Sequence, residues 1–216
     1  MARRLIYLSE RTMNGSQQVD PSIGSLVEAL DSPDWDERTA ASERLIAMGS
    51  MAYPLLIDQI RVGSMRRAVS AARVLAAQDH SVVYDTMTGL IPSENPLLGQ
   101  IAVEYVARQP HAVDVLLDNL HTSTYLVQIS IVQALGMLGS SKALEPLLQI
   151  LSAPNTGSSL RLTVVSALGM LGDPRAIPHL QALLESADEH MVKRVKRALE
   201  NFAHYLDSDE GQAKSS

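Results

Sequence analysis

Apolar residues recur along most of the chain with the spacing of an α-helix, in blocks separated by short polar breaks. In one such stretch, helical spacing runs over 143–151, stops at the Pro- and Gly-containing segment 153–157, and resumes over 160–171. Period-two alternation typical of β-strands is absent. The pattern therefore predicts an all-α chain built from helix–turn–helix pairs.

These helix pairs repeat along the sequence. Gln-Ala-Leu-Gly-Met-Leu-Gly ends at Gly139, and Ser-Ala-Leu-Gly-Met-Leu-Gly ends 33 residues later at Gly172. Comparable ends recur about every 30 residues, which is typical of solenoid proteins. Six repeats are predicted, at residues 20–49, 50–78, 79–109, 110–139, 140–172 and 173–203. The third departs most from the pattern; residues 1–19 are predicted to be an N-terminal segment and linker, and 204–216 a disordered tail.

Proline and glycine mark the expected ends of the helices. Pro21 and Pro174 each follow an aspartate, which places an N-cap acceptor before a proline at the first helical position. Gly49, Gly139 and Gly172 stand where helices should stop, since glycine enters the left-handed C-cap conformation without strain. The positions of these prolines and glycines agree with the predicted repeat boundaries.

A family resemblance rests mainly on the fifth and sixth repeats. The residues that carry it are Arg161, Val164, Val165, Ala167, Leu168, Gly169, Leu171, Gly172, Asp173, Pro174, Arg175, Ala176, Pro178 and Leu180. Their pattern resembles the HEAT-like repeat of phycobilin lyases and many bacterial scaffold proteins, and the match covers most of 20–203. The resemblance implies a right-handed α-solenoid (an α-α superhelix) of about six HEAT-like helix pairs, with the second helix of each pair on the concave side. It specifies fold better than function.

On that geometry, the second helices should expose a stripe that is small and apolar, although exposed helix faces normally carry charges. The stripe residues singled out as partner-binding candidates are Val69, Val103, Ile129, Gln133, Met137, Leu162, Ser166 and Met170. Three interpretations stay open. The stripe is a groove for a partner, or curvature and neighbouring helices partly bury it, or the alignment is shifted by one residue.

The sixth repeat places Lys193, Arg194 and Arg197 at the stripe positions, with Lys196 beside them. One hypothesis is a polar cap that stops a second molecule from stacking on the end of the solenoid. The other is a basic patch for an acidic partner or a carboxylate-bearing ligand. The two are compatible.

Arginine also recurs at one position of the second helices. Arg67 aligns with Arg38 and Arg161, where the family commonly has an arginine that bonds to neighbouring turns. We therefore expect these arginines to have a structural role.

Composition narrows the functional classes. The 216 residues are 46% hydrophobic, contain no cysteine, and carry a formal net charge of −6. The missing cysteine excludes thiol catalysis, disulfides and cysteine metal sites, and the acidic balance argues against a nucleic-acid-binding protein. Apolar runs are too short for a membrane span. We expect a cytoplasmic protein that is a monomer or a weak oligomer.

No catalytic constellation, metal site or cofactor is predicted. No two of the six histidines are three or four residues apart, as a shared metal ion on one helix side would require. A di-iron hydroxylase would have His-Glu pairs at repeat spacing, whereas this sequence has a single reversed pair, Glu189-His190. The favoured function is a non-catalytic scaffold or adaptor that binds a protein partner through its concave face. The alternative, implied by the resemblance, is a phycobilin lyase subunit or a related bilin-handling chaperone, which is also the type of enzyme expected if the chain is one.

Overall fold

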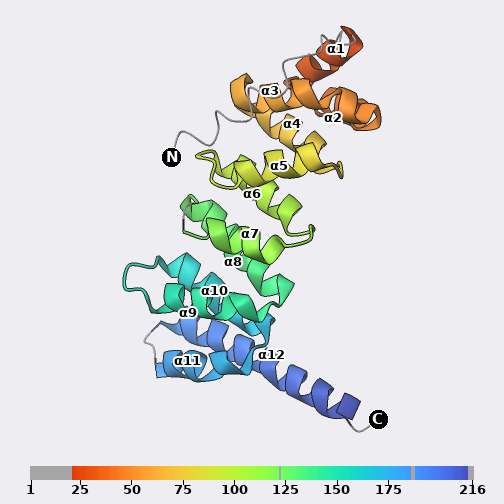
Figure 1. The fold of residues 1–216 in the computed structure, drawn as a ribbon. Coiled ribbons are helices and arrows are strands. Elements are labelled where there is room, and N and C mark those ends of the chain that lie inside the picture. Colours follow the sequence, from red (N-terminus) through yellow and green to blue (C-terminus); the bar gives the residue numbers. More distant parts are fainter. Residues whose placement is uncertain (1–20, 122, 186–187, 214–216) are drawn as a thin grey trace. The chain divides into compact units, whose positions relative to one another are not determined.

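The computed structural model describes residues 21–121, 123–185 and 188–213, and side chains between residues 22 and 202 of these ranges. The predicted N-terminal segment 1–19 and residues 214–216 lie outside them. The α-helices are α1 (Pro21–Ala29), α2 (Trp35–Met48), α3 (Tyr53–Val62), α4 (Met65–Ala76), α5 (Ser81–Leu90), α6 (Pro96–Val106), α7 (Ala112–Asn119), α8 (Tyr125–Leu138), α9 (Leu144–Ser152), α10 (Ser158–Leu171), α11 (Ile177–Ala182) and α12 (Glu189–Ala213) (Figure 1). Four short 3₁₀ helices accompany them, namely η1 (Gly49–Met51), η2 (Ser141–Ala143), η3 (Pro174–Ala176) and η4 (Leu183–Glu185).

The predicted all-α helical-repeat fold is confirmed, because the described residues form twelve α-helices and no strand. The chain divides into two compact units, an N-terminal unit (Met1–Gln78) and a C-terminal unit (Asp79–Ser216). The sequence predicted a single repeat domain over 20–203. The division falls between its second and third predicted repeats, beside the repeat that departs most from the pattern.

In the N-terminal unit, α1 packs with α2 and α3 with α4, and the second helices α2 and α4 contact each other. Leucines fill the space between these helices. Leu30, Leu45, Leu56 and Leu75 are all completely buried. This is the burial that helical apolar spacing requires.

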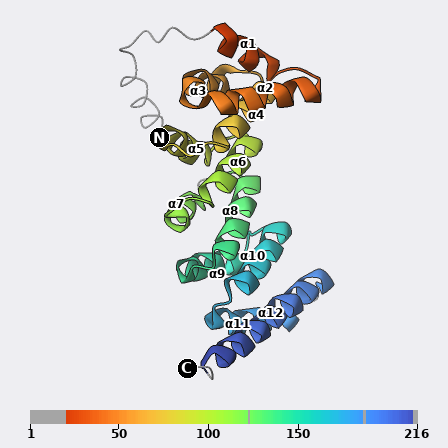
Figure 2. The same ribbon diagram turned by 90° about the vertical axis from the view of Figure 1, so that its right-hand side faces the viewer.

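In the C-terminal unit, the second helices α6, α8, α10 and α12 contact one another in succession, and each packs with the first helix of its own pair. Figure 2 shows α7 and α9 on one side of this unit and α8 and α10 on the other. The core between the layers is mainly aliphatic, with Leu116, Ile131, Leu135 and Leu168 completely buried. This stacking of helix pairs is that of an α-solenoid.

Glycine at a repeated position lets neighbouring second helices approach closely. A Cβ on Gly136 of α8 would lie 2.7 Å from Ala167 Cα of α10, and one on Gly169 of α10 would lie 2.7 Å from Ala198 Cβ of α12. Real Cβ atoms do not come this close, so the glycine hydrogens are part of the packing. A glycine packed against an alanine therefore joins α8 to α10, and a second glycine and alanine join α10 to α12 in the same way.

We expect the Gly136→Ala variant to lose about 1–3 kcal/mol of unfolding free energy, because the added methyl group meets the backbone of Ala167 and the helices must separate. Gly89→Ala on α5 is the matched control, since its Cβ would meet no atom within 4 Å. Helix propensity alone should make that control more stable by about 0.4–1 kcal/mol. Urea unfolding followed by circular dichroism measures both. Equal effects of the same sign would contradict the close contact.

The predicted helix ends are largely as expected. Gly139 and Gly172 have φ of 65° and 70° and end α8 and α10 in the left-handed conformation. Gly49 also has a positive φ of 57°, but its ψ of −133° lies outside the left-handed helical region. Pro21 begins α1, whereas the aspartate before it lies outside the described residues. At the other predicted start, Asp173 accepts a hydrogen bond from the backbone N–H of Arg175, 3.1 Å away, and caps η3.

Asp173 also forms an ion pair with Arg175, with 2.6 Å between Oδ2 and Nη2. The side-chain hydrogen bond from Arg175 holds the pKa of Asp173 below its ordinary value of 3.8, against the opposing effect of partial burial. A carboxyl with a lowered pKa stabilises the fold above its ordinary pKa, and this contribution disappears as the pH falls through the folded-state pKa.

We therefore expect Asp173→Ala to lower the unfolding free energy by about 0.5–2 kcal/mol near neutral pH. The difference from the parent chain should shrink as the pH drops below 3.8 and the carboxyl takes up a proton. Asp173→Asn is the control, because asparagine keeps the cap but cannot titrate. A difference between the parent chain and Asp173→Ala that is the same at acidic and neutral pH would contradict the role of the charge.

Helix α12 continues past residue 203, where the predicted repeat domain ends, and runs to Ala213. The expectation of a disordered tail over 204–216 stays a prediction. No proline interrupts the stretch after the predicted end at 203, and extending an existing helix costs much less than starting one.

Candidate functional site: the free face of the C-terminal unit

Helix α10 is covered on three sides, by α8, α9 and α12. On α10, Ala167 faces α8. Gly169, about half a turn further along α10, faces Ala198 of α12. A third side of α10 carries Val164 and Leu168, which are completely buried. The remaining quarter of α10 carries Leu162, Ser166 and Met170, which are all half-buried. Predicted stripe and observed free side therefore coincide on this helix.

On α8 the equivalent side is more open. Met137 is 70% exposed and Leu126 is 49% exposed, with Gln133 exposed and Ile129 half-buried between them. These residues recur at three, seven and eleven positions after Leu126, so they follow one side of the helix. Three of the four are large and apolar.

On α12 this side becomes basic. Arg194 and Arg197 are exposed, and Arg194 Nη1 donates a hydrogen bond to Ser166 Oγ of α10 at 3.2 Å. That hydrogen bond places the two helices' polar atoms on the same side of the unit. We call the set the free face; its residues are Leu126, Ile129, Gln133, Met137, Leu162, Ser166, Met170, Arg194 and Arg197.

Lys193 lies at the edge of this surface. Together with Lys196 and Arg197 it lines a hollow that also includes Glu189, Val192 and Glu200, all from α12. The two glutamates place opposite charge beside the lysines. Arg197 lies beside the same glutamates, whereas Arg194 is not among the residues that line the hollow.

Two residues of the predicted stripe are not brought into the free face. Val103 on α6 is only 2% exposed, whereas Glu104 beside it is exposed. The alignment was shifted by one residue in the third repeat, because Gly99 and Val103 turn inward and a Cβ on Gly99 would overlap Val127 of α8. Val69, half-buried on α4, belongs to the N-terminal unit.

Sequence reasoning missed Leu126 and the glycine contacts. Leu126 lies in the first turn of α8, one turn before the first position considered for the stripe, and its spacing to Gln133 and Met137 was the available signal. Glycine and alanine recurring at repeat spacing would have indicated the close helix contacts. Neighbouring Tyr125 accepts a hydrogen bond at its Oη from Leu160 N–H at 3.3 Å, which ties the start of α8 to α10.

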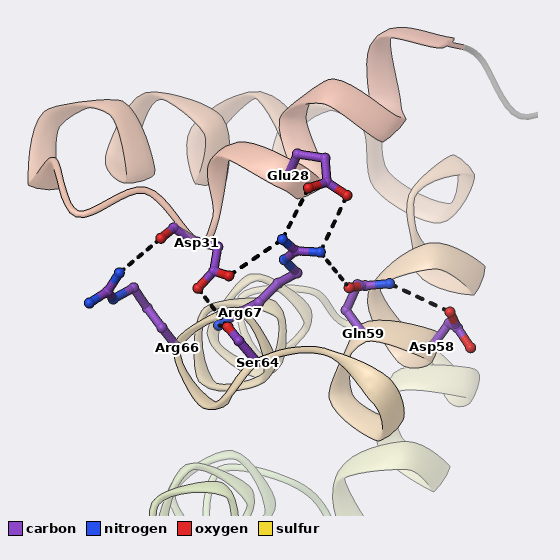
Figure 3. Close-up of polar contacts among 7 residues, drawn as sticks. All are labelled: Glu28, Asp31, Asp58, Gln59, Ser64, Arg66 and Arg67. Atoms are coloured by element: carbon purple, nitrogen blue, oxygen red, sulfur yellow. Dashed lines mark hydrogen bonds and ion pairs between the residues drawn. The ribbon is translucent and has the colours of Figure 1, made fainter.

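The arginine cluster in the N-terminal unit is structural, as the sequence predicted for Arg67 (Figure 3). Arg67 contacts both carboxylate oxygens of Glu28, with Nη2–Oε2 at 3.0 Å, and lies 3.4 Å from Asp31 Oδ2. It also donates to Gln59 Oε1 at 3.2 Å, and its side chain is 19% exposed. Arg38, the aligned residue, donates to the backbone oxygen of Ser32 at 2.6 Å. Arg67 therefore ties α4 to α1 with its charge met by carboxylates, and Arg38 bonds to the turn before α2.

Among the described residues, no group of three or more histidine, aspartate and glutamate side chains is arranged to hold a metal ion. No helix in the same part of the chain is both long enough and apolar enough to span a membrane. The chemistry of the free face is therefore that of apolar contact, hydroxyl and amide hydrogen bonding, and positive charge.

Comparison with known proteins identifies the class of repeat. Residues 113–200 match the family of HEAT repeats, which confirms the resemblance seen in the sequence. This stretch of the chain is therefore made of HEAT repeats, and it contains every residue of the free face. No curated protein matches the chain at a significant level.

Among the similar solved structures, one with a TM-score above 0.5 agrees with the fold. A chain from the structure of Kap95p with RanGDP is similar over 87% of this chain and 29% of its own length, with 14% identity and a TM-score of 0.60. Human deoxyhypusine hydroxylase with glycerol matches over 85% of this chain and 96% of its own, with 14% identity and a TM-score of 0.44. The phycocyanin lyase complex of Nostoc sp. matches over 88% and 97%, with 16% identity and a TM-score of 0.33. At 14% identity the similarity to the chain of the Kap95p structure concerns the fold alone.

Proposed function

We propose that this chain is a non-catalytic HEAT-repeat adaptor that binds a protein partner through the free face. The observation that carries the proposal is the exposure of Met137 and Leu126, at 70% and 49%, near the two ends of α8, on the side that also carries half-buried Ile129. A solvated helix side normally carries charged residues, and contiguous apolar residues at a surface mark interaction sites. Neither α8 nor α10 contributes a charged residue to this face.

The side chains of the free face suit a protein partner. Met137 and Met170 are flexible and polarizable, so they adapt to apolar side chains of varied shape. Ile129 and Leu162, half-buried beside them, lose little further solvation when a partner covers them. Gln133 and Ser166, which lie between the apolar residues, add hydrogen-bonding groups, and protein interfaces usually combine apolar contact with such polar groups.

The helical-repeat architecture supports the same function. Stacked repeats expose one side of successive second helices as an extended surface, and repeat proteins use such surfaces for binding. The similar chain in the Kap95p–RanGDP structure comes from a complex of proteins, which agrees with a protein partner for this chain.

A photoreactive amino acid placed at Met137 tests the proposal in cells that make the protein. We expect irradiation to link position 137 to a defined protein, which mass spectrometry then identifies. The control places the same amino acid at Gln181, an exposed residue of α11. Crosslinks that form at position 181 and not at 137 would overturn the proposal.

A further inference from the structure

Charge changes across the second helices of the C-terminal unit. Glu104 of α6 is exposed on the far side of α8, the centre over α8 and α10 is uncharged, and α12 presents Arg194 and Arg197. A partner lying across these helices therefore meets apolar residues first and positive charge at the α12 end. The two ends of this row of helices therefore differ in charge, so a partner can distinguish them.

The two cations at the α12 end differ in their surroundings, because Arg197 lines the hollow that also contains Glu189 and Glu200, and Arg194 does not. Among the side chains described, neither Arg194 nor Arg197 forms an ion pair, whereas Arg67 and Arg175 do. The hydrogen bond to Ser166 fixes Arg194 beside the apolar centre at 3.2 Å. Guanidinium groups bind carboxylates in two-pronged geometry, so these two side chains are suited to aspartate or glutamate of a partner.

Helix packing sets the length of the ligand. Neighbouring packed helices lie about 8–10 Å apart, so the path from α8 across α10 to α12 is about 20 Å. A helical segment covers that path with about 13 residues at 1.5 Å per residue. The floor consists of helix sides whose backbone groups are already bonded within the helices. On this floor only Gln133 and Ser166 of α8 and α10 offer side-chain hydrogen bonds to the backbone of an extended peptide, whereas a helix satisfies its backbone groups internally.

We propose that the partner binds as an amphipathic helix of about four turns, with apolar side chains over α8 and α10 and carboxylates over Arg194 and Arg197. This inference rests on the proposed function, because it specifies the ligand of the same face. Apolar side chains of the helix cover Met137 and Met170. The carboxylates at its end determine its direction across the repeats.

Selection from a library of displayed peptides, each about 14 residues long, tests the partner class with the full chain as bait. We expect the selected peptides to combine apolar residues at helical spacing with aspartate or glutamate at one end. In fluorescence anisotropy, replacing those acids by lysine should weaken binding about tenfold or more. The Arg194→Glu, Arg197→Glu double variant should reverse that preference, so that the lysine peptide binds more tightly.

The outcomes separate this inference from the proposed function. Selected peptides that Met137→Glu no longer binds, but that bind equally well with acidic or basic ends, would overturn the acidic partner and leave the face as a binding site. The same inference fails if no peptide is selected while position 137 still crosslinks to a protein. A single-stranded oligonucleotide that binds more tightly than any peptide would also overturn it. Selected peptides that bind the Met137→Glu variant as tightly as the parent chain would overturn the proposed function itself.

Discussion

The Leu168→Ala variant is expected to lose about 2–5 kcal/mol of unfolding free energy. Leu168 is completely buried in α10, at the layer between the first and second helices. Removing most of its side chain leaves a cavity that close-packed neighbours fill only in part. Urea unfolding monitored by circular dichroism gives the difference from the parent chain.

Ser166→Ala, two residues away, is the control. Its hydroxyl donates to the backbone oxygen of Leu162 and accepts from Arg194, both at the free face. Such a serine bond inside a helix adds little stability, and alanine is the better helix former, so the expected change is below about 1 kcal/mol. Similar losses for the two variants would contradict this assignment of buried and free sides, and a larger loss for Ser166→Ala would show that the two sides of α10 have been exchanged.

Met137→Glu is expected to separate binding from stability. The residue is 70% exposed, so a glutamate there stays hydrated in the free protein and should change the unfolding free energy by no more than about 0.5 kcal/mol. Once a partner covers the site, the carboxylate must lose water without a cation over α8 to replace it. We expect the binding free energy to weaken by about 2 kcal/mol or more, measured by anisotropy with a selected peptide.

Met51→Glu is the matched control in the N-terminal unit, since Met51 is 64% exposed and lies outside the free face. It should leave both binding and stability unchanged. If Met137→Glu unfolds the C-terminal unit, the α8 stripe belongs to the core. If it folds and binds like the parent chain, the partner site lies elsewhere.

The repeat pattern of the sequence is sufficient to predict much of this fold. The Ala-Leu-Gly-Met-Leu-Gly segments predict the ends of α8 and α10, because a glycine after a helical run forms the left-handed cap seen at Gly139 and Gly172. Helical spacing alone places Leu168 inside and Ser166 outside. The free face on α10 could therefore be predicted residue by residue.

Other features depend on contacts that spacing does not encode. In the weakly matching third repeat, a shift of one residue turns a helix by about 100°, enough to exchange buried Val103 with exposed Glu104. Gly136 looks like a helix-weakening residue in the sequence, and its role is visible only when Ala167 is placed against it. The hydrogen bond between Arg194 and Ser166, two residues 28 positions apart on different helices, places the positive charge of α12 beside the uncharged part of the free face.

Methionine methyl groups provide the most direct test of the binding face. In protein labelled with ¹³C at the methionine methyls, a selected peptide should shift the NMR signals of Met137 and Met170, which lie on the free face. The signals of Met51 and Met65, exposed by 64% and 67% in the N-terminal unit, should stay in place. Shifts at Met51 or Met65 with none at Met137 and Met170 would contradict the account.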